Sequence, residues 1–335
     1  MVEGARATGQ AHPWVAEGEG RIRFGVSIYP QPVDWRHFIG LVRQMEELGF
    51  DSYWSYDHPT ARADCWTALT ALAMATERIR LGTMVTCIYY RAPYLLARMA
   101  ADVDRLSEGR LVLGLGIGDN VPEFEQMGIP FPPVPVRQRA MEETIAILRG
   151  LWSGAPFAFA GESFQASSDG SFVGPVQSPS IPILLAGGGE KVTLRQVARF
   201  ADASNMGAHD WIGGAVTAAD IARKFAKIRA FCAEAGRPYE SVLRSHFTMP
   251  LVLAGSREAL AAKLRRWPAE TVAWWGPALF AGTAAEAIAF YQGLVEAGFQ
   301  YFIANTLDGD DETIELLGRE VMPAFGGASR TRGGK

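Results

Sequence analysis

Short apolar runs alternate along the chain with longer stretches in which apolar residues recur every three or four positions. The short runs are typical of buried strands, and the longer stretches have the spacing of amphipathic helices. We predict strands at residues 23–28, 52–55, 79–85, 111–115, 181–186, 203–206, 247–253 and 301–304. We predict helices at about residues 33–48, 66–73, 93–106, 136–152, 191–200, 218–235, 284–297 and 312–321.

This alternation gives eight strand–helix units, which indicate parallel strands covered by helices on the outside. The count favours a single closed (β/α)8 TIM barrel over residues 21–325. The alternative is an open doubly wound sheet, which usually has fewer units. Residues 1–20 and 326–335 are polar or glycine-rich, and we expect both to be flexible tails.

Three connections are longer than ordinary loops: residues 120–135, 153–180 and 255–282. We expect them to be insertions at the carboxyl-terminal face of the barrel. The first is rich in proline and cannot be helical throughout, and the second resembles a hairpin. The third contains Trp267, Trp274, Trp275 and Phe280, and we interpret it as a substrate-binding wall. The alternative is surface decoration.

Composition limits the class of protein. Hydrophobic residues make up 48% and charged residues 20% of the chain, as in a soluble globular protein. The chain has no long uninterrupted apolar run and no secretory signal, so we expect a cytoplasmic protein without membrane partners. The net charge of −4 argues against nucleic-acid binding. The three cysteines show no regular spacing, which argues against disulfides and structural zinc.

Asp57 and His58 follow an apolar strand directly. In a parallel barrel the carboxyl ends of the strands carry the active site. A histidine there can donate or accept a proton at neutral pH, and a neighbouring acid can orient it. We therefore predict a site role for this pair. The alternative is that His58 caps the next helix or fills a gap beneath a loop.

The fourth strand leads into Gly114, Gly116 and Gly118, followed by Asp119. This run is not a dinucleotide fingerprint, because Asp119 replaces the third glycine and a proline-rich loop follows. We expect the glycines to let a flat ring approach the backbone, with Asp119 as a carboxylate on the rim. The alternative is a tight turn with a solvated aspartate.

Gly187, Gly188 and Gly189 end another apolar strand and precede a helix. Free backbone N–H groups at such a turn suit a phosphate, and the hydroxyl of Thr193 could contribute. The Walker sequence is absent. Cys87 has no sequence signal that pairs it with a histidine, so we expect no covalent catalysis. No clustered ligand set indicates a metal.

These segments together resemble the bacterial-luciferase-like superfamily, and within it the branch that uses the deazaflavin coenzyme F420. The resemblance runs from about residue 21 to residue 323. The matching pieces are residues 50–58 (FDSYWSYDH), 78–83 (RIRLGT), 109–116 (GRLVLGLG), 127–132 (MGIPFP) and 193–205 (TLRQVARFADASN).

The resemblance implies a (β/α)8 barrel with a flavin-type ring at the carboxyl ends of the strands. The phosphate of the cofactor would lie against Gly187–Gly189 and near Thr193. A non-prolyl cis peptide bond is expected behind the ring, and its equivalent position is Cys87–Ile88. Thr86, Cys87 and Ile88 are accordingly expected to line the cofactor site.

Residue roles also follow from the resemblance. Asp57 and His58 match positions that contact the ring or act on substrate protons in related enzymes. Asp119 matches a position often held by glutamate and is expected to assist catalysis. Gln196 and Ser204 depart from the common pattern of leucine and tryptophan.

The resemblance implies an oxidoreductase that transfers a hydride between F420 and a small organic substrate, with His58 handling the accompanying proton. One alternative is a monooxygenase that uses reduced FMN. A second is a non-catalytic protein that binds a flavin-type ligand or no ligand. A homodimer is expected, and the substrate is not indicated.

Overall fold

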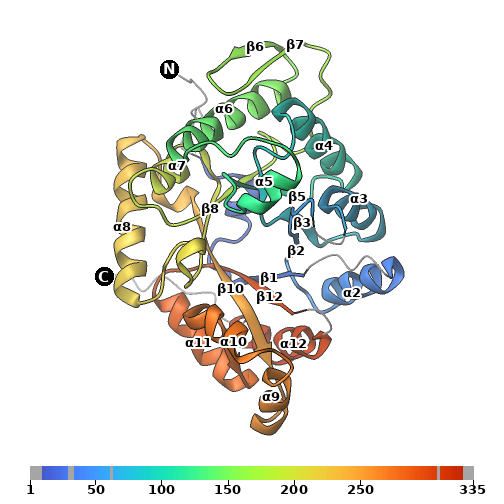
Figure 1. Cartoon of the computed structure of the whole chain (residues 1–335), viewed down its shortest axis with the longest axis vertical. Helices are drawn as coiled ribbons and strands as arrows, with labels where there is room; N and C mark the ends of the chain where they lie inside the picture. The colour runs from blue at the N-terminus through green and yellow to red at the C-terminus, as the bar shows by residue number, and fades with distance from the viewer. Residues whose placement is uncertain (1–9, 29–33, 61–62, 308–309, 327–335) are drawn as a thin grey trace.

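Eight parallel strands form a closed barrel in the computed structural model, which describes residues 10–28, 34–60, 63–307 and 310–326 (Figure 1). Strand β12 pairs with both β1 and β10, which closes the ring and confirms the predicted TIM barrel. In order around the barrel, the strands are β1 (Arg23–Ser27), β2 (Ser52–Ser55), β3 (Arg80–Thr83), β5 (Leu111–Gly116), β8 (Ile183–Ala186), β9 (Ala203–Met206), β10 (Leu243–Leu253) and β12 (Tyr301–Thr306).

Helices surround this barrel on the outside (Figure 1). The longer ones are α2 (Trp35–Glu47), α3 (Cys65–Ala75), α4 (Pro93–Leu106), α6 (Val134–Trp152), α7 (Thr193–Phe200), α8 (Ala218–Glu234) and α11 (Ala284–Glu296). The last strand is followed by α12 (Asp311–Leu316), a π-helical turn (Leu317–Val321) and a 3-10 turn (Met322–Phe325). Short 3-10 turns η1 (Asp210–Ile212) and η2 (Tyr239–Ser241) precede α8 and β10.

The three long connections each contain secondary structure. The proline-rich first one holds the short helix α5 (Val121–Gln126). The second forms the antiparallel hairpin β6 (Pro156–Ala160) and β7 (Gln165–Asp169), as its sequence indicates. This connection joins α6 to β8, and the Ser180 carbonyl at its end accepts a hydrogen bond from His12 beside α1. It therefore reaches the amino-terminal end of the barrel, and its predicted place at the carboxyl-terminal face is wrong. The third contains α9 (Arg257–Leu264), α10 (Ala269–Trp275), the turn η3 (Gly276–Ala278) and β11 (Phe280–Gly282), which pairs in parallel with the end of β10.

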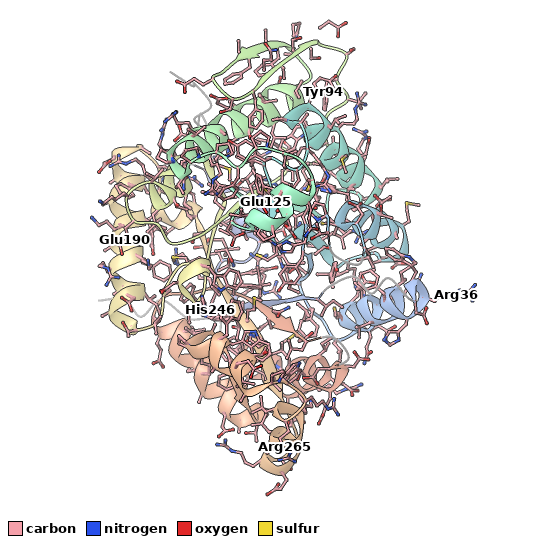
Figure 2. The ribbon with its side chains drawn as sticks, viewed as in Figure 1. Arg36, Tyr94, Glu125, Glu190, His246 and Arg265 are labelled. Atoms are coloured by element: carbon pink, nitrogen blue, oxygen red, sulfur yellow. The ribbon has the colours of Figure 1, made fainter. Side chains whose placement is uncertain are left out.

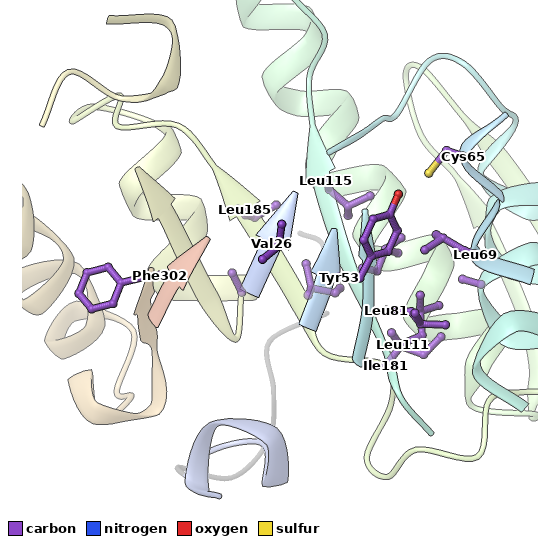
Figure 3. Close-up of a cluster of buried hydrophobic side chains, with 14 of the residues drawn as sticks. Val26, Tyr53, Cys65, Leu69, Leu81, Leu111, Leu115, Ile181, Leu185 and Phe302 are labelled. Atoms are coloured by element: carbon purple, nitrogen blue, oxygen red, sulfur yellow. The ribbon is translucent and has the colours of Figure 1, made fainter. Parts of the chain in front are cut away.

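Neighbouring positions on a strand supply two different apolar clusters, because side chains alternate between the two faces of a strand. Tyr53 and Leu185 belong to the larger cluster between the strands and the helices (Figure 3). Trp54 and Leu184 belong to a smaller cluster inside the barrel. The Trp54 ring lies against Gly82 of the next strand, where a Cβ atom would overlap it. Both faces of the strands are therefore buried, as parallel strands require.

The third strand ends earlier than the sequence predicts. Strand β3 stops at Thr83, and residues Thr86–Cys87 form a separate short strand, β4, that pairs only with β5. The non-prolyl cis peptide bond lies between Met84 and Val85, at this break. The predicted position at Cys87–Ile88 is therefore wrong. The unbroken apolar sequence of residues 79–85 gives no sign that the strand ends at Thr83.

The amino-terminal segment also differs from the prediction. Residues 1–9 and 327–335 lie outside the described residues, but residues 10–20 are not a free tail. They hold the short helix α1 (Pro13–Ala16), and Trp14 is only 1% exposed. Its indole packs edge-on against Tyr301 at 5.8 Å, beside the guanidinium of Arg23. Because Arg23 and Tyr301 begin β1 and β12, Trp14 covers the amino-terminal end of the barrel.

Trp14→Ala should lower the free energy of unfolding by about 3–5 kcal/mol, the usual cost of emptying a buried tryptophan site. Urea unfolding followed by circular dichroism measures this change. Met74→Ala on α3 is the matched control, because Met74 is 69% exposed and should shift stability by less than about 0.5 kcal/mol. A Trp14→Ala protein as stable as the control would show that α1 contributes nothing to the fold.

Candidate active site

A cavity of about 230 Å3 opens at the carboxyl-terminal ends of the barrel strands. Residues at or just beyond the ends of β2, β3, β5, β8 and β9 contribute to it, and β10 adds Phe247 and Met249. Its lining comprises Tyr56, Asp57, His58, Met84, Val85, Cys87, Tyr90, Gly116, Ile117, Gly118, Asp119, Ala186, Gly187, Asn205, Trp211, Ile212, Phe247 and Met249. This is the face on which TIM-barrel enzymes carry their chemistry.

His58 lies at the end of β2, where the sequence predicts it, and it is held by a residue that the sequence analysis missed. Its Nδ1 atom lies 2.8 Å and 3.0 Å from the two carboxylate oxygens of Glu123 on α5. The imidazole is about one-third exposed, whereas the Glu123 side chain is almost fully buried. The Tyr56 ring stacks on the imidazole at 6.1 Å. His58 is therefore fixed on one side and open to the cavity on the other.

Three side chains donate hydrogen bonds to the Glu123 carboxylate: His58, Tyr90 through its phenol, and Thr60 through its hydroxyl at 3.0 Å. Burial opposes ionisation of Glu123, but these hydrogen bonds outweigh it and hold the pKa below its ordinary value. Burial and the bond to Glu123 raise the pKa of Tyr90. The carboxylate therefore stays ionised and selects the tautomer of His58 that carries its proton on Nδ1.

The lowered pKa of Glu123 also makes the stability of the fold depend on pH. Because its folded-state pKa is lowered, ionised Glu123 stabilises the fold above its unfolded-state pKa near 4.5. This contribution is lost as the pH falls through the lower, folded-state pKa.

Asp57 has a different position from the one expected of a proton-handling partner of His58. Its carboxylate accepts a hydrogen bond from Arg91 at 2.6 Å and one from the Thr86 hydroxyl at 2.8 Å. Arg91 also binds Asp64 at 3.1 Å. Burial raises the pKa of Asp57, and the bonds from Arg91 and Thr86 offset this only in part. Asp57 thus ties the end of β2 to β4 and to the loop before α4.

The other predicted residues are divided between the cavity and the core. Asp119 is exposed on the cavity rim, but the carboxylate that binds His58 belongs to Glu123, four residues further along. Cys87 lines the cavity, and burial raises the pKa of its thiol to about 12, which disfavours a nucleophilic thiolate. Ile88 is fully buried in the core and Thr86 is buried against Asp57, so neither lines the described cavity.

A second cavity of about 320 Å3 lies beside the first and is lined by Gly187, Gly188, Gly189 and Thr193. The two cavities share the lining residues Ile117, Gly118, Asp119, Ala186, Gly187 and Trp211. The two cavities therefore adjoin along a shared wall, with His58 in one and the glycine run in the other, as expected for an elongated cofactor. We call the two adjoining cavities together the hollow.

The glycine run fits an anionic group. The backbone N–H groups of Gly188, Gly189 and Thr193 have no hydrogen-bond partner among the described residues. Thr193 begins α7, so its N–H group also lies at the positive end of that helix. Gly188 is packed so closely on Gly213 that a Cβ atom would overlap the Gly213 carbonyl. Lys224, absent from the sequence-based prediction, supports the run by donating to the Gly188 carbonyl at 2.8 Å.

Two side chains of α6 border this second cavity. The guanidinium of Arg137 donates to the carbonyl oxygens of Pro132, Ile117 and Gly118 and lies over the Phe131 ring. The side-chain N–H of Gln138 donates to the Thr193 hydroxyl at 3.3 Å, and its side-chain oxygen Oε1 is buried without a partner among the described residues. The donors of this cavity therefore suit the phosphate of a flavin-type cofactor.

The tryptophans of the third insertion occupy different environments. Trp267 packs edge-on against Trp275, and Phe280 stacks on Phe290. Trp274 stacks on Trp211, which lines both cavities. Arg265 lies beside α9 at one tip of the molecule, well away from α5, where Glu125 is labelled (Figure 2). One aromatic residue of this insertion thus reaches the neighbourhood of the cavity, through Trp211.

Two further properties concern metals and membranes. Within residues 10–28, 34–60, 63–307 and 310–326, no three His, Cys, Asp or Glu side chains are grouped so that they could hold a metal ion. Among the helices described, none combines the length and apolar character that crossing a bilayer requires.

Comparison with known proteins identifies relatives along almost the whole chain. Residues 20–312 match the family model described as luciferase-like monooxygenase. A 5,10-methylenetetrahydromethanopterin reductase from Archaeoglobus fulgidus is 28% identical over 90% of this chain and 99% of its own length. The pyrimidine monooxygenase RutA from Allorhizobium ampelinum is 30% identical over 66% of this chain and 60% of its own.

Among solved structures, a coenzyme F420-dependent tetrahydromethanopterin reductase from Methanopyrus kandleri has a TM-score of 0.75 at 22% identity. The match covers 91% of this chain and 99% of the reductase. At this level of identity, the similarity supports the barrel fold.

Proposed function

This chain belongs to the luciferase-like monooxygenase family, and on that premise we propose that it is an F420-dependent oxidoreductase acting on a small organic molecule. The observation that carries the proposal is the pair of adjoining cavities, one lined by His58 and the other by the glycine run Gly187–Gly189. Such a hollow suits a cofactor with a flat ring at one end and a phosphate-bearing tail at the other.

The choice of F420 is supported by the sequence of the tail site and by the relatives. The run Gly-Gly-Gly-Glu-Lys-Val-Thr at residues 187–193 resembles the phosphate loop of the deazaflavin enzymes. The reductase that matches 90% of this chain is named for a tetrahydromethanopterin reaction. A solved reductase of that reaction type is described as F420-dependent.

The side chains around the ring site then have distinct roles. When bound, the deazaflavin would supply or accept a hydride. His58 would exchange the accompanying proton with the substrate through Nε2, because its Nδ1 atom is held by Glu123. Glu123 would be a positioning residue that orients the imidazole through its contact with Nδ1. Asp119, on the rim, would contact substrate rather than His58.

An alternative is a monooxygenase that uses reduced FMN. The description of the family and the similarity to RutA favour it. Both cofactors have a tricyclic ring and a phosphate, so the hollow alone does not separate them.

Cofactor titration separates the two proposals. We expect F420 to bind with a micromolar or lower dissociation constant and, at 100 times that constant, to add about 2.7 kcal/mol to the free energy of unfolding. Anaerobic mixing with candidate ketones, alcohols or activated alkenes should change the F420 absorbance. FMN at the same concentrations is the control. Absence of F420 binding at micromolar concentrations, or oxygen uptake that requires reduced FMN, would refute the proposal.

A further inference from the structure

Two tryptophans are stacked at the mouth of the hollow. Trp211, in η1 after β9, and Trp274, at the end of α10, have ring centroids 6.2 Å apart and planes inclined by 20°. The His209 ring lies 5.6 Å from Trp211 and 5.2 Å from Trp274. Although stacked, the two tryptophans remain 42% and 56% exposed. Exposed apolar surface of this kind is typical of a binding site.

Trp211 is the member of this cluster that lines the cavities. It borders both the cavity at His58 and the cavity at the glycine run. Further apolar side chains line the His58 cavity near it, from η1 and β10. They are Ile212, Phe247 and Met249. The Tyr56 ring packs edge-on against Phe247 at 6.4 Å and on its other side stacks on His58. An apolar wall thus runs from the tryptophan pair to the imidazole.

The charges around His58 disfavour an anion. No lysine or arginine is among the described residues that line the His58 cavity. Its acidic residues are Asp57, whose charge is matched by Arg91, and Asp119 on the rim. The positive charge that His58 can acquire is already matched by Glu123. A carboxylate or phosphate on the substrate would therefore lose water without gaining a cation, which is costly.

We propose that the substrate of this enzyme is an uncharged, flat aromatic or conjugated carbonyl compound or the corresponding alcohol, and that Trp211 is a specificity-determining residue that holds it by stacking. This inference rests on the proposed function and adds the substrate class. Trp274 supports Trp211 from behind, and the apolar wall directs the polar end of the compound toward His58.

Two isosteric probes test the charge requirement. Acetophenone and benzoate have the same ring and nearly the same shape, but only benzoate is charged at pH 7. Their dissociation constants are measured by equilibrium dialysis against protein saturated with oxidised F420, which cannot reduce the ketone. Acetophenone should bind at least tenfold more tightly than benzoate. Cyclohexyl methyl ketone, which is not flat, should bind several-fold more weakly than acetophenone.

Substitution of Trp211 tests whether its ring holds the substrate by stacking. Trp211→Ala should weaken acetophenone binding about tenfold, and Trp211→Phe should restore most of it. Because Trp211 also borders the cavity at the glycine run, F420 binding should weaken in Trp211→Ala too, but by a clearly smaller factor than acetophenone binding. Trp267→Ala is the matched control, because Trp267 lies in the third insertion and packs on Trp275 instead of lining either cavity. It should leave acetophenone binding within about twofold.

The outcomes are separable. Equal or tighter binding of benzoate would overturn the charge argument. A loss of F420 affinity in Trp211→Ala as large as the loss of acetophenone affinity would place Trp211 against the cofactor instead and overturn its assigned role. F420 binding by the wild-type protein is measured first. If the wild-type protein does not bind F420, the proposed function is refuted, but the substrate class is not. In that case the same dialysis without cofactor tests the preference for neutral probes.

Discussion

Replacement of His58 by glutamine should reduce turnover by about 10²- to 10⁴-fold, the usual contribution of a general acid or base. Glutamine can fill the space and donate a hydrogen bond to Glu123, but it cannot take up or release a proton at neutral pH. The F420 dissociation constant should stay within about threefold, because the proposed site of the cofactor tail is in the other cavity, at Gly187–Gly189 and Thr193. Steady-state kinetics and F420 titration on the same samples measure the two effects.

Glu123→Gln is the companion variant that separates positioning from catalysis. A neutral amide keeps the shape, but its nitrogen cannot accept the hydrogen bonds that the carboxylate accepts from His58, Tyr90 and Thr60. The imidazole should then be held less firmly, and we expect a loss of turnover that is smaller than in His58→Gln. Full activity in His58→Gln, or a loss in Glu123→Gln as large as that in His58→Gln, would exclude this acid–base arrangement.

Gly188→Ala should weaken F420 binding by roughly 10- to 100-fold, equivalent to losing one or two hydrogen bonds to a charged group. A Cβ atom at this position would overlap the Gly213 carbonyl, so the glycine run must move away from its present place. The N–H groups of Gly188 and Gly189 would then no longer converge on the phosphate. Fluorescence titration of F420 measures the loss.

Gly255→Ala provides the control, because a Cβ atom there meets no other atom within 4 Å. It should bind F420 like the wild-type protein. Thermal unfolding of both variants without cofactor shows whether Gly188→Ala still folds. If it does not, Thr193→Val, which removes one hydroxyl at the start of α7, replaces it and should weaken binding severalfold. Unchanged F420 affinity in a folded Gly188→Ala protein would contradict the assignment of this run to the phosphate.

Much of the fold could be predicted from the sequence because its signal is local. Each parallel strand is buried on both faces, so runs such as residues 111–115 and 301–304 stand out against the helical periodicity between them. The place of His58 and of Gly187–Gly189 at the carboxyl ends of strands follows from that alternation once the barrel is recognised.

The features that the sequence did not reveal depend on contacts between distant segments. Glu123 acts on His58 from 65 positions further along the chain. Its helix α5 is short, and Pro122 within it made the whole connection resemble an irregular loop. The spacing of Val121 and Phe124, three positions apart, was the available sign of a helical turn. Trp14 was missed because its burial depends on Tyr301, at the far end of the chain.

The buried position of Trp14 has a consequence for the order of ligand binding. Trp14 adds to a cluster that fills the inside of the barrel together with Trp54 and Leu184, so the proposed cofactor and substrate would both enter from the carboxyl-terminal face, beside the stacked tryptophans. If the cofactor ring lies deeper than the substrate, it has to bind before the substrate does. Kinetic patterns should therefore be sequential and ordered, with the deazaflavin binding first and leaving last.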